Sequence, residues 1–216
     1  MNFDEFKFKS PKLKKIKLPG EEAHHKLAPF FRLKELEKPL SERIKAKQAG
    51  VMAVFYPDEK ELTRFVLILR RTYKGVHSNQ IGFPGGRVEK EDRDLEHTAL
   101  RETEEEVGIP QHEIQVIKEL TKIYIPPSNF WVYPFFGIME KTPVLVRQES
   151  EVEAILEVEL DDFLHDSSLI NQKLSTSYAK NVDVPAFLLN DHVVWGATAM
   201  ILSEMKELLK QGLFEL

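Results

Sequence analysis

Three glutamates within five residues are the part of this sequence best suited to chemistry. Glu102, Glu105 and Glu106 are spaced i, i+3 and i+4, which places their carboxylates on one face of an α-helix. Such like charges repel each other by about a few tenths of a kcal/mol per pair. A divalent cation would remove the repulsion, and Mg²⁺ and Mn²⁺ prefer carboxylate oxygens as ligands. Taken alone, however, an acidic run is more often a solvated helix face neutralised by Lys or Arg.

The residues on both sides of the glutamates favour the metal site over the solvated face. Pro84-Gly85-Gly86 cannot comfortably continue a strand or a helix, so residues 81–86 are predicted to form a loop with special backbone angles. From about Asp94 the pattern becomes helical, and Gly108 stands where a helix would be capped at its C-terminus.

The whole stretch from residue 86 to residue 109 resembles the Nudix box. That box reads Gly, five residues, Glu, seven residues, then Arg-Glu-aliphatic-any-Glu-Glu-any-Gly-aliphatic. The direct matches are Gly86, Arg101, Glu102, Glu105, Glu106, Gly108 and Ile109. The departures are Asp92 in place of the first Glu, eight residues between Asp92 and Arg101, and Thr103 at the aliphatic position.

The resemblance implies a metal-dependent hydrolase of diphosphates, in which Mg²⁺ or Mn²⁺ neutralises the phosphates and activates water. Glu102 and Glu106 would be the principal metal ligands, Glu105 would serve a second ion or its water, and the Gly86 carbonyl would add a further ligand. Arg101 would orient the carboxylates. Nudix enzymes often draw a base or accessory ligand from a later loop, which here would be Glu151, with Glu149 and Glu153 as rivals.

Further segments resemble the coenzyme A pyrophosphatase branch of this family. They are Leu67-Ile68-Leu69-Arg70-Arg71, His77-Ser78-Asn79-Gln80-Ile81-Gly82-Phe83-Pro84-Gly85-Gly86, Tyr133-Pro134-Phe135-Phe136-Gly137 and Trp195-Gly196-Ala197-Thr198-Ala199. The same branch carries the Asp and the longer spacer. The resemblance therefore implies hydrolysis of coenzyme A or an acyl-coenzyme A to 3′,5′-ADP and a 4′-phosphopantetheine product. Asn79, Gly82 and Lys74-Gly75 depart from the pattern of the branch.

Several basic residues precede the glycine loop and could bind the substrate. Arg70, Arg71 and Lys74 have side chains suited to binding phosphate groups, and the alternative is that they are ordinary surface charges at the end of a strand. His77 either forms a hydrogen bond to the substrate or braces the loop, and we favour the bracing role. Another nucleotide derivative such as ADP-ribose or NADH is the alternative substrate. A non-catalytic binding module is disfavoured because all three glutamates are present.

Strand and helix patterns indicate what positions these residues. We expect strands near residues 51–56, 65–69, 114–125, 130–139 and 184–189, and helices near 41–48, 94–107, 160–164 and 196–209. Strands mixed with scattered helices predict an α/β (α+β sandwich) architecture, a mixed β-sheet between helices, which is also the Nudix fold that the resemblance implies.

Composition limits the remaining possibilities. The 216 residues fit a Nudix domain of residues 49–216 with an N-terminal extension, residues 1–48, packing on it. The lysines of that extension form a solvated face or, in a sharper reading, an arm contacting a substrate or the partner of a homodimer. A net charge of −5 disfavours nucleic-acid binding. The absence of cysteine, of a signal-like start and of a 20-residue apolar run predicts a soluble, cytoplasmic protein that binds no membrane.

Overall fold

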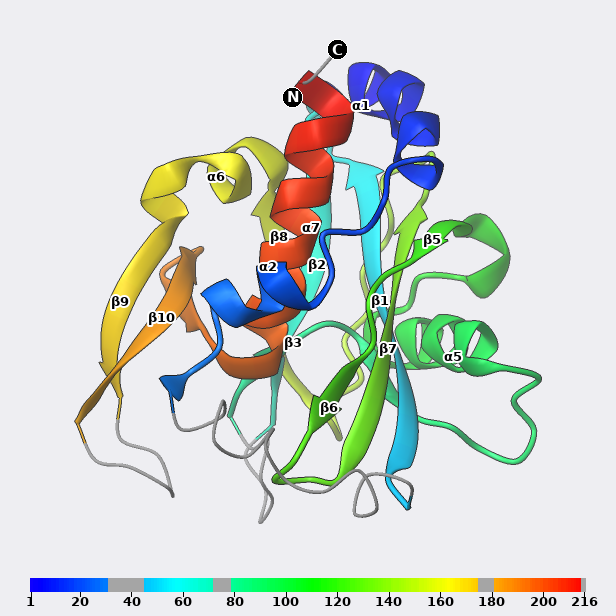
Figure 1. Ribbon diagram of the computed structural model, residues 1–216. Helices are drawn as coiled ribbons and strands as arrows, with labels where there is room; N and C mark the ends of the chain where they lie inside the picture. Colours follow the sequence, from blue (N-terminus) through cyan, green and yellow to red (C-terminus); the bar gives the residue numbers. More distant parts are fainter. Residues whose placement is uncertain (31–44, 72–78, 175–180, 215–216) are drawn as a thin grey trace.

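The computed structural model describes residues 1–30, 45–71, 79–174 and 181–214. Its centre is a mixed sheet in which β1 (Lys47–Pro57) runs parallel to β7 (Phe130–Ile138) and antiparallel to β2 (Thr63–Arg70). The strand order is β3-β2-β1-β7-β5, with β4, β6 and β8 pairing β1, β7 and β2. Helix α7 (Gly196–Phe214) covers one face and α5 (Leu95–Val107) the other (Figure 1). The expected mixed sheet between helices is confirmed.

Strand β1 is buried on both faces because its side chains are apolar almost without interruption. Alternate residues point to opposite sides, so Phe55 joins the cluster under α7, whereas Val54 and Tyr56 join the cluster under α5. Thr98, Ala99 and Val107 close the second cluster from α5. The second cluster therefore fixes α5 to the sheet.

The remaining strands complete the sheet. They are β3 (Ile81–Gly82), β4 (Gly85–Arg87), β5 (Gln115–Glu119), β6 (Ile123–Ile125) and β8 (Val152–Glu159). The loop expected over residues 81–86 therefore contains two short strands, and the strand expected over 114–125 is divided in two. Strand β8 was not predicted. Short helix α6 (Leu160–Leu164) lies where expected.

A second, smaller sheet follows, with the order β11-β10-β9. Its strands are β9 (Leu169–Leu174), β10 (Val182–Leu189) and β11 (His192–Val194). Asn190 and Asp191 both have positive φ, as a two-residue turn between β10 and β11 requires. Strand β9 was not predicted.

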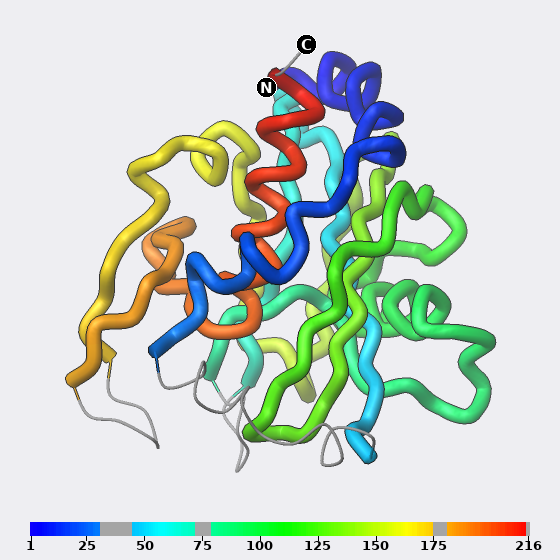
Figure 2. The backbone as a smooth tube through the Cα atoms, viewed as in Figure 1, coloured from blue at the N-terminus to red at the C-terminus, as the bar shows by residue number. Residues whose placement is uncertain are grey.

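The N-terminal residues form α1 (Phe3–Lys9), the 3₁₀ helix η1 (Ser10–Lys14) and α2 (Glu21–Lys26). Figure 2 shows this segment running alongside α7, with α1 at the C-terminal end of that helix. Phe6 is fully buried and its ring stacks on Phe55 with centroids 5.2 Å apart. Residues 1–30 therefore share the core of the main sheet. The domain boundary at residue 48 stays a prediction.

A buried carboxylate ties this segment to α7. Glu204 accepts hydrogen bonds from the Gly20 and Thr121 N–H groups, both at 3.0 Å, and lies 3.3 Å from His24 Nε2. Burial alone would raise the pKa of Glu204, but the hydrogen bonds from His24 and Thr121 hold it below its ordinary value. The carboxylate thus caps the start of α2, where no side chain of α2 itself does so.

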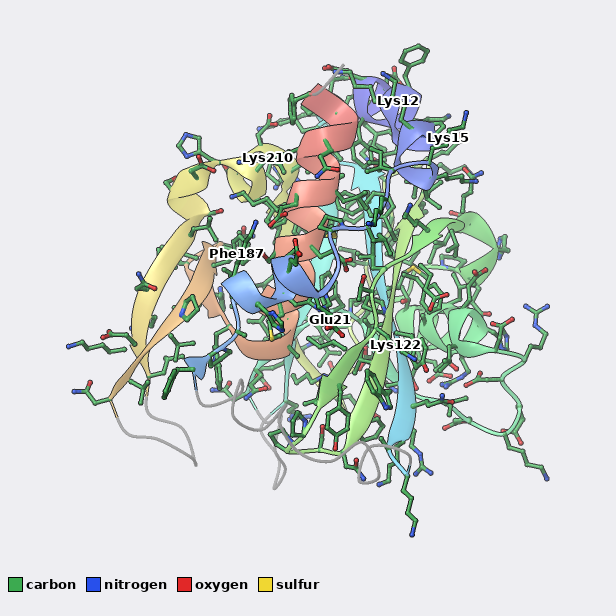
Figure 3. The ribbon with its side chains drawn as sticks, in the orientation of Figure 1. Lys12, Lys15, Glu21, Lys122, Phe187 and Lys210 are labelled. Carbon is green, nitrogen blue, oxygen red and sulfur yellow. The ribbon has the colours of Figure 1, made fainter. Side chains whose placement is uncertain are left out.

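Two expectations about the N-terminal region meet the structure only in part. Half of the helix expected over residues 41–48 lies outside the described residues, and its last two residues belong to β1 instead. Lys12, Lys14, Lys15 and Lys17 are exposed, and Lys12 and Lys15 lie at the periphery in Figure 3. Within the described ranges, no helix is long and apolar enough to span a membrane.

Candidate active site

Helix α5 starts and stops where its sequence requires. The Asp94 side chain accepts a hydrogen bond of 2.7 Å from the His97 N–H and caps the N-terminus. Gly108 adopts the left-handed conformation with φ of 78°, and its N–H bonds the Glu104 carbonyl. These two ends, both expected from the sequence, set the rotation of the helix and so the direction of its glutamates.

Glu106 is the buried member of the glutamate set. Its side chain is 1% exposed, and Oε2 accepts the Gly85 N–H at 2.7 Å. Among the described residues, Oε1 has no hydrogen-bond partner, and the nearest cation is Arg70 Nη1 at 3.5 Å. Burial raises the pKa of Glu106 to about 7, although the charge of Arg70 opposes the shift. A buried carboxylate oxygen without a partner is costly, and a bound cation would satisfy it.

Glu102 lies against the glycine loop. A Cβ atom added to Gly86 would be 2.4 Å from the Glu102 carboxylate, so only glycine leaves room for it. Burial raises the pKa of Glu102, Arg101 opposes the shift, and the charges of Glu105 and Glu151 add to it. Two carboxylates of α5 thus converge on Gly85 and Gly86.

Arg101 holds the outer side of the site. Its Nε and Nη2 donate to the two oxygens of Asp92 at 2.9 and 3.0 Å. Nη2 also donates to Glu102 at 3.1 Å, and Nη1 donates to Glu105 at 3.2 Å. The Asp92 side chain is fully buried, and the hydrogen bonds from Arg101 keep its pKa well below the usual range. Sequence reasoning left the role of Asp92 open. The structure makes it the brace of Arg101, a role that its distance of nine residues does not reveal.

The segment between β7 and β8 brings Glu151 to the site. Gln148 N–H bonds the Glu106 carbonyl at 3.1 Å, and the Gln148 carbonyl accepts the Glu151 N–H at 3.2 Å. Glu151 is exposed, yet its charge raises the pKa of both Glu102 and Glu106. Gln148 was not singled out from the sequence, because a backbone contact leaves no signature in residue type.

The rivals of Glu151 are engaged elsewhere. The Glu149 carboxylate lies 3.9 Å from Arg147, and the Glu153 carboxylate lies 3.8 Å from Arg71. Arg71 is 55% exposed. Of these three glutamates, Glu151 is the one whose charge acts on both Glu102 and Glu106, which favours it over Glu149 and Glu153.

The residues expected to bind substrate are divided by the structure. Arg70 Nη2 donates to the Gly85 carbonyl at 2.5 Å and so faces the glycine loop. Arg71 extends toward the exposed segment after β7. Lys74 and His77 lie outside the described residues. The substrate-binding roles of all four stay predictions.

The oxygen atoms that Glu102 and Glu106 present beside the glycine loop are suitable ligands for a divalent cation. Across the described ranges, no three His, Asp or Glu side chains already converge closely enough to enclose an ion, and Glu105 is held by Arg101. The open positions are the unpaired Oε1 of Glu106 and the carboxylate of Glu102 beside Gly86. Oxygen donors of this kind suit Mg²⁺ or Mn²⁺.

Comparisons with known proteins identify the family of the chain. A NUDIX domain is recognised over residues 46–177, more than half of the chain. "Nudix hydrolase 15, mitochondrial" of Arabidopsis thaliana is 28% identical over 172 residues, covering 76% of this chain and 60% of that protein. A mitochondrial coenzyme A diphosphatase of Homo sapiens is 32% identical over 142 residues, covering 65% of this chain and 60% of that protein. The matches thus span only 60% of the length of these two relatives.

Solved structures match the fold. A MutT/nudix family protein from Enterococcus faecalis superposes with a TM-score of 0.50 at 18% identity, covering 91% of this chain and 74% of that one. The recognised domain begins one residue before β1 and contains α5 with the whole glycine loop. The chain belongs to the Nudix family.

Proposed function

We propose that the protein is a hydrolase that cleaves the diphosphate bond of coenzyme A or its acyl derivatives, with Mg²⁺ or Mn²⁺ as cofactor. The products would be 3′,5′-ADP and 4′-phosphopantetheine or its acyl form. The observation that carries the hydrolase assignment is the pair of carboxylates on α5 that converges on Gly85-Gly86, with one buried oxygen of Glu106 unpaired.

The coenzyme A class rests on likeness rather than on geometry. A coenzyme A diphosphatase is among the similar proteins, and the segments before and after the box resemble the same branch. A small nucleotide is also consistent with the acidic character of the chain, whose net charge is −5. Nucleic acid, with its many phosphates, would require a basic surface.

Each residue of the site has a defined task in this reaction. Glu102, Glu106 and the Gly86 carbonyl would hold the cation. When bound, the cation neutralises the diphosphate and makes water more acidic. Glu106 would release its proton on binding it, because burial otherwise holds the pKa of Glu106 at about 7.

Glu151 is the proposed general base. It would take one proton from the water as the water oxygen bonds to phosphorus and the bridging P–O bond breaks. Its exposure to solvent and the effect of its charge on Glu102 and Glu106 support this role. Arg101 would act through the carboxylates that it holds, as a positioning residue.

A product analysis tests the proposal. The protein is incubated with coenzyme A, ADP-ribose or NADH, each with and without Mn²⁺, and the products are identified by chromatography and mass spectrometry. We expect 3′,5′-ADP from coenzyme A only when Mn²⁺ is present. Good turnover of ADP-ribose or NADH with none of coenzyme A would replace the substrate class. No turnover of any substrate would favour a binding module.

A further inference from the structure

Arg70 occupies an unusual place beside the catalytic loop. It is the last residue of β2, and its backbone N–H donates to the Gln80 carbonyl at 3.0 Å. The pairing of β2 with β8 shifts register between Leu69 and Arg70. Such an irregularity re-aims the side chain that follows it, and here the guanidinium turns toward Gly85.

The guanidinium completes a closed set of contacts around Gly85. Arg70 Nη2 donates to the Gly85 carbonyl at 2.5 Å, and the Gly85 N–H donates to Glu106 Oε2 at 2.7 Å. Arg70 Nη1 lies 3.5 Å from the other oxygen of the same carboxylate. Both backbone polar groups of Gly85 are therefore held by side chains: Glu106 accepts from its N–H, and Arg70 donates to its carbonyl.

Position 85 requires glycine, both for its backbone angle and for space. Its φ is +148°, and an added Cβ would lie 2.4 Å from the Gly50 carbonyl of β1. The peptide that leads into Gly86 is consequently held by β1, by Glu106 and by Arg70. The position of Gly86 beside Glu102 depends on this peptide.

Arg70 also compensates the negative charge of Glu106 without forming a hydrogen bond to Glu106 Oε1. A buried carboxylate needs a nearby cation, and Arg70 is the cation that the described residues bring closest to Glu106. Its distance from Oε1 is too long for a good hydrogen bond, and that oxygen has no other partner. The charge is compensated while the lone pairs of Oε1 stay free.

We propose that Arg70 is a positioning residue that fixes the Gly85-Gly86 loop and Glu106 for cation binding, rather than a ligand of substrate phosphate. Its Nη2 already donates to the Gly85 carbonyl, its Nη1 faces the Glu106 carboxylate, and its side chain is only 25% exposed. The neighbouring Arg71 is 55% exposed and provides a matched control. The activity measurements below rest on the proposed hydrolase function, whereas the metal-binding measurement does not.

Arg70→Lys separates the two roles because it keeps the charge and removes the planar fork. Lys binds phosphate well as a point charge, but it cannot make the two separate contacts of Arg70. Mn²⁺ binding to the protein alone is measured by electron paramagnetic resonance. We expect Arg70→Lys to weaken Mn²⁺ binding by about 10-fold or more, as loss of a group that orients metal ligands does. Arg71→Lys should leave it within about twofold, and circular dichroism checks the fold of both.

Steady-state kinetics with coenzyme A and saturating Mn²⁺ supply the second measurement. For Arg70→Lys and Arg70→Gln we expect kcat to fall by about 10- to 100-fold while KM stays within about threefold. Unchanged Mn²⁺ affinity in Arg70→Lys, together with a KM that rises mainly in Arg70→Gln, would establish phosphate binding and overturn the proposal. If the wild type does not hydrolyse coenzyme A, the proposed substrate fails, but the Mn²⁺ measurement still decides the role of Arg70.

Discussion

Replacing Gly86 by Ala is the most direct test of the site, because the structure gives the size of the disturbance. The added Cβ would lie 2.4 Å from the Cδ and Oε1 atoms of Glu102. Ordinary contact begins at about 3.5 Å, so the carboxylate must move by about 1 Å. The backbone of Gly86 does not have positive φ, so alanine itself introduces no strain there.

A displacement of about 1 Å in a catalytic group can cost on the order of 100-fold in rate. This corresponds to about 2.7 kcal/mol in the activation free energy. We therefore expect Gly86→Ala to lower kcat for coenzyme A by about 100-fold. The free energy of unfolding should change by less than about 1 kcal/mol, because the atoms that must give way belong to the end of a flexible side chain.

Gly82→Ala is the matched control from the adjacent short strand. Its added Cβ would meet Arg70 Nε at 3.8 Å and Thr198 Oγ1 at 4.0 Å, both ordinary contacts. We expect kcat within about threefold of wild type by the same reasoning. Initial rates at saturating Mn²⁺ and urea unfolding are measured for both variants. Wild-type kcat in Gly86→Ala, or an equal loss in Gly82→Ala, would refute the placement of Glu102.

Three further predictions concern stability as well as activity. Glu106→Gln should reduce kcat by more than about 100-fold yet raise the unfolding free energy of the metal-free protein at pH 8 by up to about 3 kcal/mol. The reason is that the pKa of Glu106 is raised to about 7, so the wild type loses stability as the pH rises from 4.5 to 7. An unfolding free energy of the wild type that does not change over this pH range would contradict the prediction. Arg101→Met leaves the buried Asp92 without its main partner, so urea unfolding should show a loss of about 2 kcal/mol, and a loss below about 0.5 kcal/mol would show that the pair is only a surface contact. Because the pKa of Glu204 is lowered, its contribution is present above pH 4.5 and lost as the pH falls; Glu204→Gln should therefore destabilise by about 2 kcal/mol at pH 7 and by less at pH 3, and an equal effect at both pH values would argue against it.

Much of the site could be predicted because it lies within one helix and its flanks. The spacing of Glu102, Glu105 and Glu106 fixes their common face, and Asp94 and Gly108 mark the helix ends by residue chemistry. What spacing could not show is that one of the three would be buried at 1% exposure and another 49% exposed. That division depends on how α5 rests against β4 and β1, which is a tertiary property.

Contacts between distant segments could not be predicted from the sequence. Arg70 reaches Gly85 through a register shift in a strand pair, and one member of that pair, β8, was not recognised. Its residues Val152–Glu159 alternate imperfectly and contain three glutamates, so they resemble a polar segment more than a strand. The N-terminal helices were missed for a related reason, since helices of seven and six residues are marginal without tertiary packing.

At Glu106, the burial that serves the reaction lowers the stability of the fold. At the residues that support α5, the same contacts serve both the stability and the reaction. Burying that carboxylate costs about 3 kcal/mol at pH 8, a large part of the roughly 5–15 kcal/mol that stabilises a typical domain. Asp94, Gly108 and the Asp92–Arg101 pair offset this cost by fixing the helix that carries Glu106. Variants of these supporting residues should therefore lower stability and rate together, whereas variants of Glu106 should move the two in opposite directions. A helix whose glutamates served only as a solvated face would show neither pattern.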